Sequence, residues 1–76
     1  MAGEKSADNI ALGEAMRVER EARGYSRETF ARRVGLEQSD VEAIERGDGN
    51  ITYLTILKIA DGLGMSLVEL VTRAEL

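Results

Sequence analysis

The chain has 76 residues, of which 43% are apolar and 32% are charged, and it contains no cysteine and no histidine. A chain of this kind is expected to fold as one small domain by packing alone, because no disulfide or thiolate metal site can hold it together. The missing histidine removes the commonest general base and metal ligand, so no enzyme is expected. No apolar run is long enough to span a bilayer and no secretory pattern opens the chain, which predicts a cytoplasmic protein.

The formal net charge of −4, taken alone, argues against nucleic acid as a partner. The charge is unevenly distributed, however. Residues 1–36 carry seven Lys or Arg and six Asp or Glu, a balance of +1, whereas residues 37–76 carry three and eight, a balance of −5. Six arginines lie between Arg17 and Arg33. From composition alone four of them are expected to form a solvated helical face, offset by nearby glutamates. The arginines are Arg17, Arg20, Arg23 and Arg27, and the glutamates are Glu14, Glu19, Glu21 and Glu28.

The absence of proline and the spacing of the glycines divide the chain into short blocks with helical periodicity, which predicts an all-α fold of five helices. Residues 1–7 have no periodic pattern and are expected to be a flexible N-terminal arm, followed by a single domain over residues 8–76. The first helix is expected from Asp8 or Asn9 to Arg23, with Asp8 as its N-cap and Gly24 as its stop. Its expected apolar stripe consists of Leu12, Ala15, Met16 and Ala22.

A second helix of about two turns is expected to begin at the N-cap Ser26 and to end at Gly35. Its expected buried residues are Phe30, Ala31 and Val34. A third helix is expected over residues 38–46, ended by Gly47. Helical spacing puts Val41, Ile44 and Glu45 on one of its faces, and turns Ser39, Glu42, Ala43 and Arg46 the other way.

The fourth helix is expected to start after Asn50, with Thr52 as its N-cap. Its expected inner stripe consists of Tyr53, Ile56, Ile59, Ala60 and Leu63. Gly62 lies inside this helix and is expected to cost up to about 1 kcal/mol. A capping box of Ser66 and Glu69 opens the fifth helix. Its residues Leu67, Leu70 and Val71 are expected to face inward.

The second and third expected helices, joined by a short turn at Gly35 and Leu36, form a helix-turn-helix candidate. From Leu12 to Val71 the chain resembles the phage-repressor, or lambda/Cro-like, family of helix-turn-helix DNA-binding proteins, which implies a five-helix lambda-repressor-like domain. The residues that carry the resemblance are Arg20, Gly24, Ser26, Phe30-Ala31, Gly35-Leu36, Val41, Ile44, Glu45-Arg46-Gly47, Asn50-Ile51-Thr52, Ile59-Ala60 and Leu63-Gly64. The Asn50-Ile51-Thr52 segment is also similar to that of restriction–modification controller proteins.

The resemblance implies that the third helix enters the major groove of duplex DNA, while helix N-termini and flanking loops hold phosphates. The base-reading residues it implies are Gln38, Ser39, Glu42 and Ala43. A glutamine can bond bidentately to adenine, and an alanine methyl can pack on thymine. The phosphate-binding residues it implies are Ser26, Arg27, Arg46, Asn50 and Tyr53. Arg27 stands where the family usually has glutamine, and a guanidinium suits a phosphate at a helix N-terminus.

The resemblance also implies an ion pair between Arg20 and Glu45, with a structural role, because an unpaired carboxylate on the inner side of a helix is costly to bury. Acidic residues beside the expected reading helix oppose phosphate binding. They are Glu37, Asp40 and Glu42.

Leu54 and Leu57 lie off the inner stripe of the fourth helix, and Val68 lies off that of the fifth. Scattered surface apolar residues need no explanation. A compact patch of three nevertheless favours a symmetric homodimer interface, because a two-fold dimer matches paired DNA half-sites.

The sequence therefore predicts a transcriptional regulator, most often a repressor in this family, that binds a palindromic operator in double-stranded DNA as a homodimer. No cofactor, metal, small-molecule ligand or membrane is expected. The alternative is a protein-interaction module, antitoxin- or antagonist-like, whose acidic third helix faces a basic partner with little or no DNA binding. Affinity for a duplex that falls with rising salt would separate the two.

Overall fold

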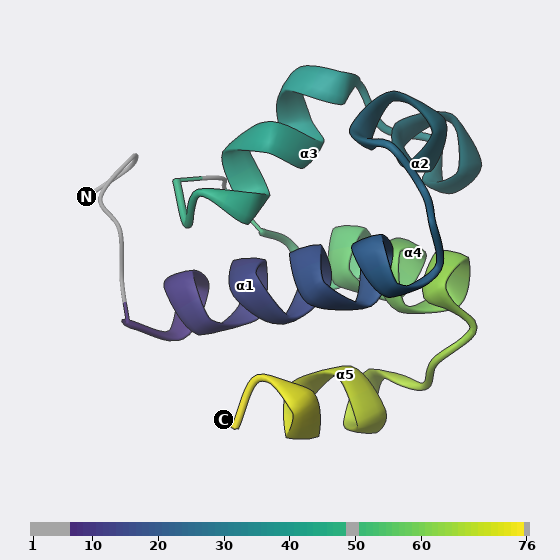
Figure 1. The fold of residues 1–76 in the computed structure, drawn as a ribbon. Coiled ribbons are helices and arrows are strands. Elements are labelled where there is room, and N and C mark those ends of the chain that lie inside the picture. Colours follow the sequence, from purple (N-terminus) through teal and green to yellow (C-terminus); the bar gives the residue numbers. More distant parts are fainter. Residues whose placement is uncertain (1–6, 49–50, 76) are drawn as a thin grey trace.

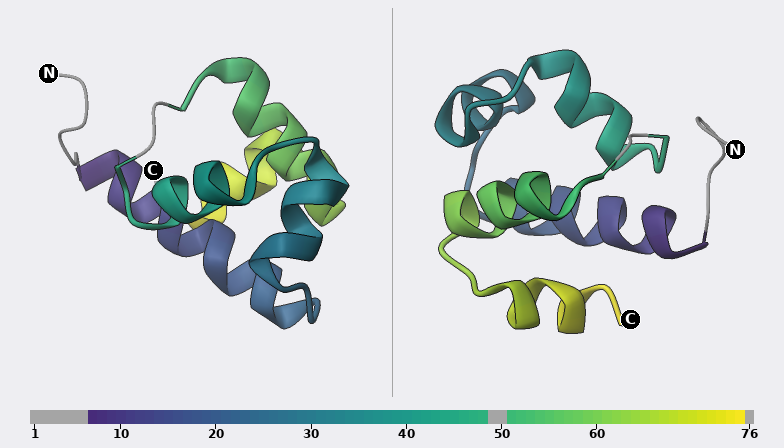
Figure 2. Two further views of the ribbon diagram at one scale, coloured as in Figure 1. Left: turned by 90° about the horizontal axis from the view of Figure 1, so that it is seen from above. Right: turned by 180° about the vertical axis from the view of Figure 1, so that it is seen from behind.

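The computed structural model describes residues 7–48 and 51–75, and this part of the chain is folded into five α-helices without a β-strand. The helices are α1 (Ala7–Ala22), α2 (Arg27–Val34), α3 (Gln38–Glu45), α4 (Tyr53–Leu63) and α5 (Leu67–Arg73). In Figure 1, α1 runs across the molecule with α2 and α3 on one side and α5 on the other. The view from behind in Figure 2 shows α4 alongside α1. The expected all-α, five-helix fold is confirmed.

Short-range signals set most of the helix boundaries. The hydroxyls of Ser26, Thr52 and Ser66 each accept a hydrogen bond from the backbone N–H three residues later, so three of the four expected N-caps are confirmed. The Ser66 and Glu69 capping box is complete in both directions.

The start of α1 differs from the expectation. Helical structure already includes Ala7, which places Asp8 in the first turn and makes its prediction as the N-cap wrong. Of the expected arm over residues 1–7, residues 1–6 lie outside the described part of the chain.

The turn between α2 and α3 depends on a left-handed residue. Gly35 has φ of 74°, and its N–H donates to the carbonyl of Ala31. The next N–H, that of Leu36, donates to the same carbonyl at 2.9 Å. A side chain at position 35 would be strained in this conformation. The glycine therefore ends α2 abruptly, which brings α3 back against it.

Each helix contributes one large side chain to the centre of the core, and these five side chains are under 2% exposed. They are Met16, Phe30, Val41, Ile59 and Leu70. Two residues expected on inner stripes were predicted wrongly, since Ala22 is exposed and Tyr53 is 70% exposed. Both lie at the end of a helix, where the apolar stripe extends past the core.

Gly62 lies where α4 packs against α2. A Cβ at this position would come within 2.3 Å of Val34 Cγ1, so any larger residue would force Val34 or one of the two helices to shift. The expected cost of glycine inside α4 is therefore offset by the close packing that it allows.

Two arginines bind the C-terminal end of α4, Arg23 directly after α1 and Arg33 from α2. Arg23 Nε donates to the carbonyl of Leu63 at 2.8 Å, and Arg33 Nε donates to the carbonyl of Gly62 at 2.7 Å. The Arg33 guanidinium also lies 5.1 Å from the centre of the Tyr25 ring. Cations at a helix C-terminus complement the helix dipole and satisfy its last carbonyls.

None of the described helices is long and apolar enough to cross a membrane.

Candidate nucleic-acid interface

The first turn of α3 presents its polar side chains to solvent. Gln38 and Ser39, predicted to read bases, are exposed, whereas Glu42 and Ala43 one turn later are half-buried. On the opposite face of α3, Val41 and Ile44 are buried against the core. The exposed end of α3 is therefore its N-terminal end, which is the end that helix-turn-helix proteins place against base edges.

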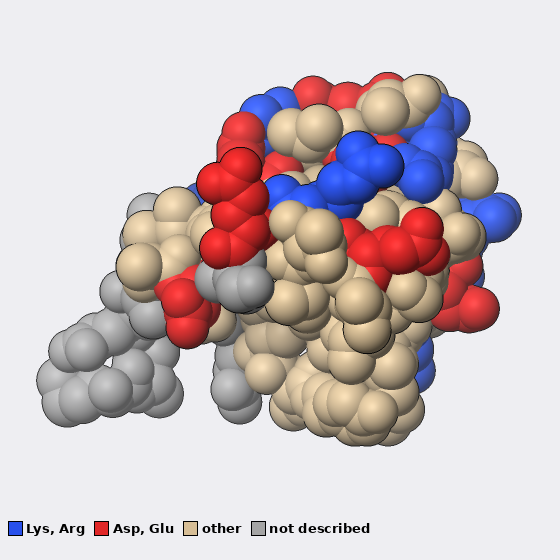
Figure 3. Space-filling model, turned by 90° about the horizontal axis from the view of Figure 1, so that it is seen from below, with Lys and Arg blue, Asp and Glu red and all other residues tan. Residues whose placement is uncertain are grey.

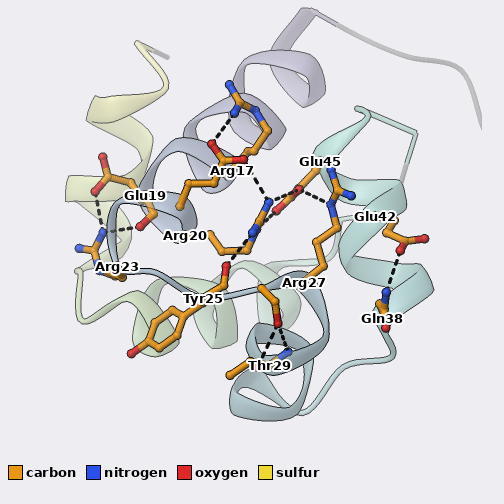
Figure 4. Close-up of polar contacts among 12 residues, drawn as sticks. Arg17, Glu19, Arg20, Arg23, Tyr25, Arg27, Thr29, Gln38, Glu42 and Glu45 are labelled. Atoms are coloured by element: carbon orange, nitrogen blue, oxygen red, sulfur yellow. Dashed lines mark hydrogen bonds and ion pairs between the residues drawn. The ribbon is translucent and has the colours of Figure 1, made fainter.

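Gln38 and Glu42 form a bonded pair along this exposed face. Gln38 Nε2 donates to Glu42 Oε2 at 3.0 Å, as Figure 4 shows. The amide keeps its Oε1 acceptor and its second N–H donor, which are the two groups that a bidentate contact with adenine requires. The bond also gives one of the acidic side chains of α3 a partner within the protein.

A buried carboxylate joins three helices at the inner edge of this surface. Glu45 of α3 is 3% exposed in its side chain, and it accepts from Arg20 of α1 through Nε at 2.6 Å and Nη2 at 3.2 Å. It also accepts from Arg27 Nε of α2 at 3.1 Å (Figure 4). Arg20 Nη1 donates further to the Tyr25 carbonyl at 2.7 Å. No buried side-chain polar atom lacks a partner within residues 7–48 and 51–75.

The structure thus brings together the two residues that the family resemblance pairs, Arg20 and Glu45, and adds Arg27 to them. The contact between Arg27 and Glu45 was not predicted. No sequence spacing indicates it, because it joins two helices whose angle is a property of the folded chain.

A second acidic and basic cluster lies on the exposed side of α1. Arg17 pairs with Glu14 one turn earlier, and its Nη1 lies 2.7 Å from Glu21 Oε1 one turn later. The hydrogen bond from Arg17 holds the pKa of Glu14 below its ordinary value of 4.5, and the same bond raises the pKa of Arg17. Among the described residues, no group of three or more acidic side chains is placed to hold a metal ion.

Two shallow polar hollows meet at Arg27. The first, of about 520 Å³, is lined by Arg20, Glu21, Ser26, Arg27, Glu28 and Gln38. The second, of about 440 Å³, is lined by Glu14, Arg17, Arg27, Glu42, Glu45 and Arg46. Arg27 is the residue they share, and its side chain is 49% exposed. An anion at this point would lie between the N-terminus of α2 and the exposed first turn of α3.

The other residues predicted to bind phosphate are differently placed. The Ser26 hydroxyl is occupied as the N-cap of α2. Arg46 is exposed and donates through Nε to Asp48 at 3.2 Å. Tyr53 is exposed at the start of α4. Asn50 lies outside the described residues.

Each of the six arginines from Arg17 to Arg33 has a carboxylate or carbonyl partner within the protein. Arg17 and Arg32 pair with acids of their own helices, and Arg20, Arg23, Arg27 and Arg33 contact other helices or the carbonyls of α4. The expected solvated face accounts for Arg17, and Arg32 was not part of it. The other four hold helices together, a role that composition did not reveal.

The predicted dimer residues lie on α4 and α5, which contact each other. Leu54 is 62% exposed and Val68 is 74% exposed, whereas Leu57 is half-buried. Figure 3 views the molecule from the α5 side and shows a broad uncharged surface beside a region of charged side chains. This arrangement leaves apolar side chains of both helices accessible to a partner.

Comparisons with known proteins place this geometry in a family. The helix-turn-helix family model HTH_3 matches residues 16–70, from within α1 to within α5. The uncharacterised HTH-type transcriptional regulator y4dJ of Sinorhizobium fredii is 41% identical over 53 residues, covering 70% of this chain and 69% of that protein. Control protein C.MunI of a Mycoplasma species is 32% identical over 59 residues, covering 78% and 80%. The crystal structure of the restriction-modification controller protein C.AhdI from Aeromonas hydrophila matches with a TM-score of 0.82 and 40% identity, covering 86% of this chain and 98% of that one.

Proposed function

The chain belongs to the helix-turn-helix family HTH_3, and on that premise we propose that it is a transcriptional regulator that binds double-stranded DNA sequence-specifically through α3. The observation that carries the proposal is the exposed first turn of α3, with Gln38 and Ser39 beside the half-exposed Arg27. Gln38 contacts adenine through the amide groups that Glu42 leaves available. Arg27 and the N-terminus of α2 take a backbone phosphate, flanked by Arg46 and Tyr53.

The acidic charge of α3 is partly compensated within the protein. Glu45 is buried between two arginines, whereas Glu42 accepts from the neutral amide of Gln38 and keeps its charge. Asp40 lies in the first turn of α3, where the helix dipole favours a negative charge. We expect binding that is weak at high salt rather than absent.

We further propose that the protein binds as a homodimer to a palindromic operator and acts as a repressor by occupying it. The exposed Leu54 and Val68 support an interface built from α4 and α5. A two-fold dimer would present two copies of α3 to half-sites one helical turn apart. Light scattering at micromolar concentration tests the interface directly, and a monomeric mass would contradict it. The proposal places the protein in the cytoplasm with DNA as its partner, and it includes no catalytic step or cofactor.

The decisive experiment is selection of bound sequences from a random duplex pool, followed by a salt titration on the selected duplex. A DNA-binding regulator yields a two-fold symmetric sequence, and the logarithm of its affinity falls linearly with the logarithm of salt concentration, by about 0.9 for each phosphate neutralised. A scrambled duplex is the matched control. Failure to enrich any sequence at low salt would contradict DNA binding and would favour a protein-interaction module whose acidic α3 faces a basic partner.

A further inference from the structure

The Glu45 carboxylate holds two arginines that differ sharply in exposure. The Arg20 side chain is 6% exposed and that of Arg27 is 49% exposed, although both donate to the same buried group. Arg20 uses Nε, Nη1 and Nη2 inside the protein. The two bonds from Arg20 to Glu45 explain how the carboxylate can be buried. The contact of Glu45 with Arg27 is therefore not needed for its burial.

The contact with Arg27 is made through Nε alone, at 3.1 Å. A guanidinium has five N–H donors in a planar fork, so four of them, on Nη1 and Nη2, remain for another acceptor. Arg27 also borders both polar hollows beside α3. The Nε side of this guanidinium is therefore held by Glu45, while Nη1 and Nη2 can donate together to a second acceptor.

We propose that Glu45 is a positioning residue for duplex binding, which holds Arg27 by its Nε so that the two terminal nitrogens face a phosphate beside the first turn of α3. The inference rests on the proposed function and deepens it. An unanchored arginine would lose its rotamer freedom on binding, whereas Arg27 is already ordered when the protein folds. The fork would also fix the register of α3 on the duplex, because a bidentate contact has a defined direction.

The opposite role for Glu45 makes an opposite prediction. If the carboxylate only neutralised Arg27 or repelled the duplex, its removal would tighten DNA binding, because a negative charge near phosphate would be lost. Under the positioning role, its removal weakens binding even though the protein becomes less acidic. The sign of the change therefore separates the two roles.

The experiment is a double-mutant cycle of Arg27→Lys and Glu45→Gln, measured on the selected duplex. Lysine keeps the positive charge but cannot donate to Glu45 and a phosphate as one planar fork. Glutamine keeps the size of Glu45 and one acceptor for Arg20. We expect Arg27→Lys to lower duplex affinity about tenfold in the wild-type background and less than about twofold in the Glu45→Gln background. The salt slope is expected to stay unchanged, because the charge at position 27 is kept.

Arg32→Lys is the matched control, because Arg32 is an exposed arginine of the same helix that pairs only locally, with Glu28 at 3.5 Å. It is expected to leave duplex affinity unchanged in both backgrounds. Effects of Arg27→Lys and Glu45→Gln that simply multiply, or tighter binding by Glu45→Gln, would overturn the inference while the proposed function stands. Absence of duplex binding by the wild-type protein would overturn both.

A second measurement is available should Glu45→Gln fail to fold. In the wild-type protein, the nitrogen–proton NMR correlation of Arg27 Nε is expected to be a single, slowly exchanging signal, and the Nη signals are expected to shift when the duplex is added. A rapidly exchanging, averaged Arg27 signal would overturn the positioning role without any variant. Arg32, on the same helix, provides the averaged reference signal.

Discussion

The helix-turn-helix side of the molecule, α2 and α3, and the apolar side, formed by Leu54, Leu57 and Val68 on α4 and α5, use opposite means of interaction. On the first, the acidic Glu45 is buried by arginines from two other helices. On the second, the apolar side chains of Leu54 and Val68 remain exposed to solvent. Net charge is therefore a poor guide to the helix-turn-helix side, because Glu45 binds Arg20 and Arg27 within the protein.

The same contrast appears within α1. Arg17 and Arg20 lie nearly one turn apart, yet Arg17 pairs with acids of its own helix at the surface and Arg20 pairs across helices in the interior. Exposed pairs are screened by solvent and contribute little. A buried carboxylate, by contrast, depends on its partners, because leaving it uncompensated is expensive.

The largest effect is expected on the helix-turn-helix side from Glu45→Ala. This substitution leaves Arg20 buried without its carboxylate and is expected to lower the free energy of unfolding by about 3–5 kcal/mol. Urea denaturation followed by circular dichroism measures the loss. Glu14→Ala, which removes an exposed partner of Arg17, is the control and is expected to leave the midpoint nearly unchanged. Equal midpoints for the two variants would contradict the contrast between buried and exposed pairs.

Gly62→Ala tests where α4 meets the helix-turn-helix side. The added methyl would lie 2.3 Å from Val34 Cγ1, and the resulting repacking is expected to cost about 1–3 kcal/mol of unfolding free energy. Adding Val34→Ala should recover part of that loss, which the thermal midpoint of the double variant would show. A stabilised Gly62→Ala protein would mean that helix propensity outweighs the close contact. Asp61→Ala, at an exposed neighbouring position, is the control.

Gln38→Ala tests the base-reading role proposed for the helix-turn-helix side. We expect it to weaken binding to the selected duplex by about 1–3 kcal/mol and to relax the preference at one base position. Arg46→Ala is the contrasting variant, since loss of a phosphate contact should weaken all duplexes alike and make the salt slope shallower. Fluorescence anisotropy on selected and scrambled duplexes measures both. An unchanged ratio between the two duplexes for Gln38→Ala would remove Gln38 from the base-reading set.

Val68→Asp tests the dimer interface proposed for the apolar side. A charge in the proposed interface is expected to weaken dimerisation by roughly 1–2 kcal/mol, which sedimentation at several concentrations would detect as a shift toward monomer. Val18→Asp changes an exposed valine of α1 in the same way and is expected to leave the mass unchanged. If both variants behaved alike, the interface would not be the α4 and α5 surface.

The smallest effect is expected from the capping box of α5. Hydrogen bonds from Ser66 hold the pKa of Glu69 below its ordinary value of 4.5. A depressed carboxyl pKa stabilises the fold above the unfolded pKa, and this contribution is lost as the pH falls through the folded value. Glu69→Ala should therefore lower the thermal midpoint slightly at neutral pH and converge with the wild type in acid. A constant difference at every pH would show that the charge of Glu69 is not involved.

Much of the fold and part of the candidate interface could be predicted from the sequence. The N-caps Ser26, Thr52 and Ser66 were identified correctly because a cap bonds to a residue only three positions away. Periodicity identified the core side chains at the middle of each helix, including Met16 and Ile59. The pairing of Arg20 with Glu45 came from the family resemblance, not from local pattern.

The number and type of the helices, three of their N-caps and the resemblance to their family could thus be read from the sequence. Three other features became visible in the folded chain: Arg27 shares the carboxylate of Glu45, Tyr53 is exposed, and Gly62 allows α4 to approach Val34. The physical reason is the range of the interactions. Caps and stripes depend on residues within one or two turns, whereas these three features depend on how helices distant in sequence are set against one another.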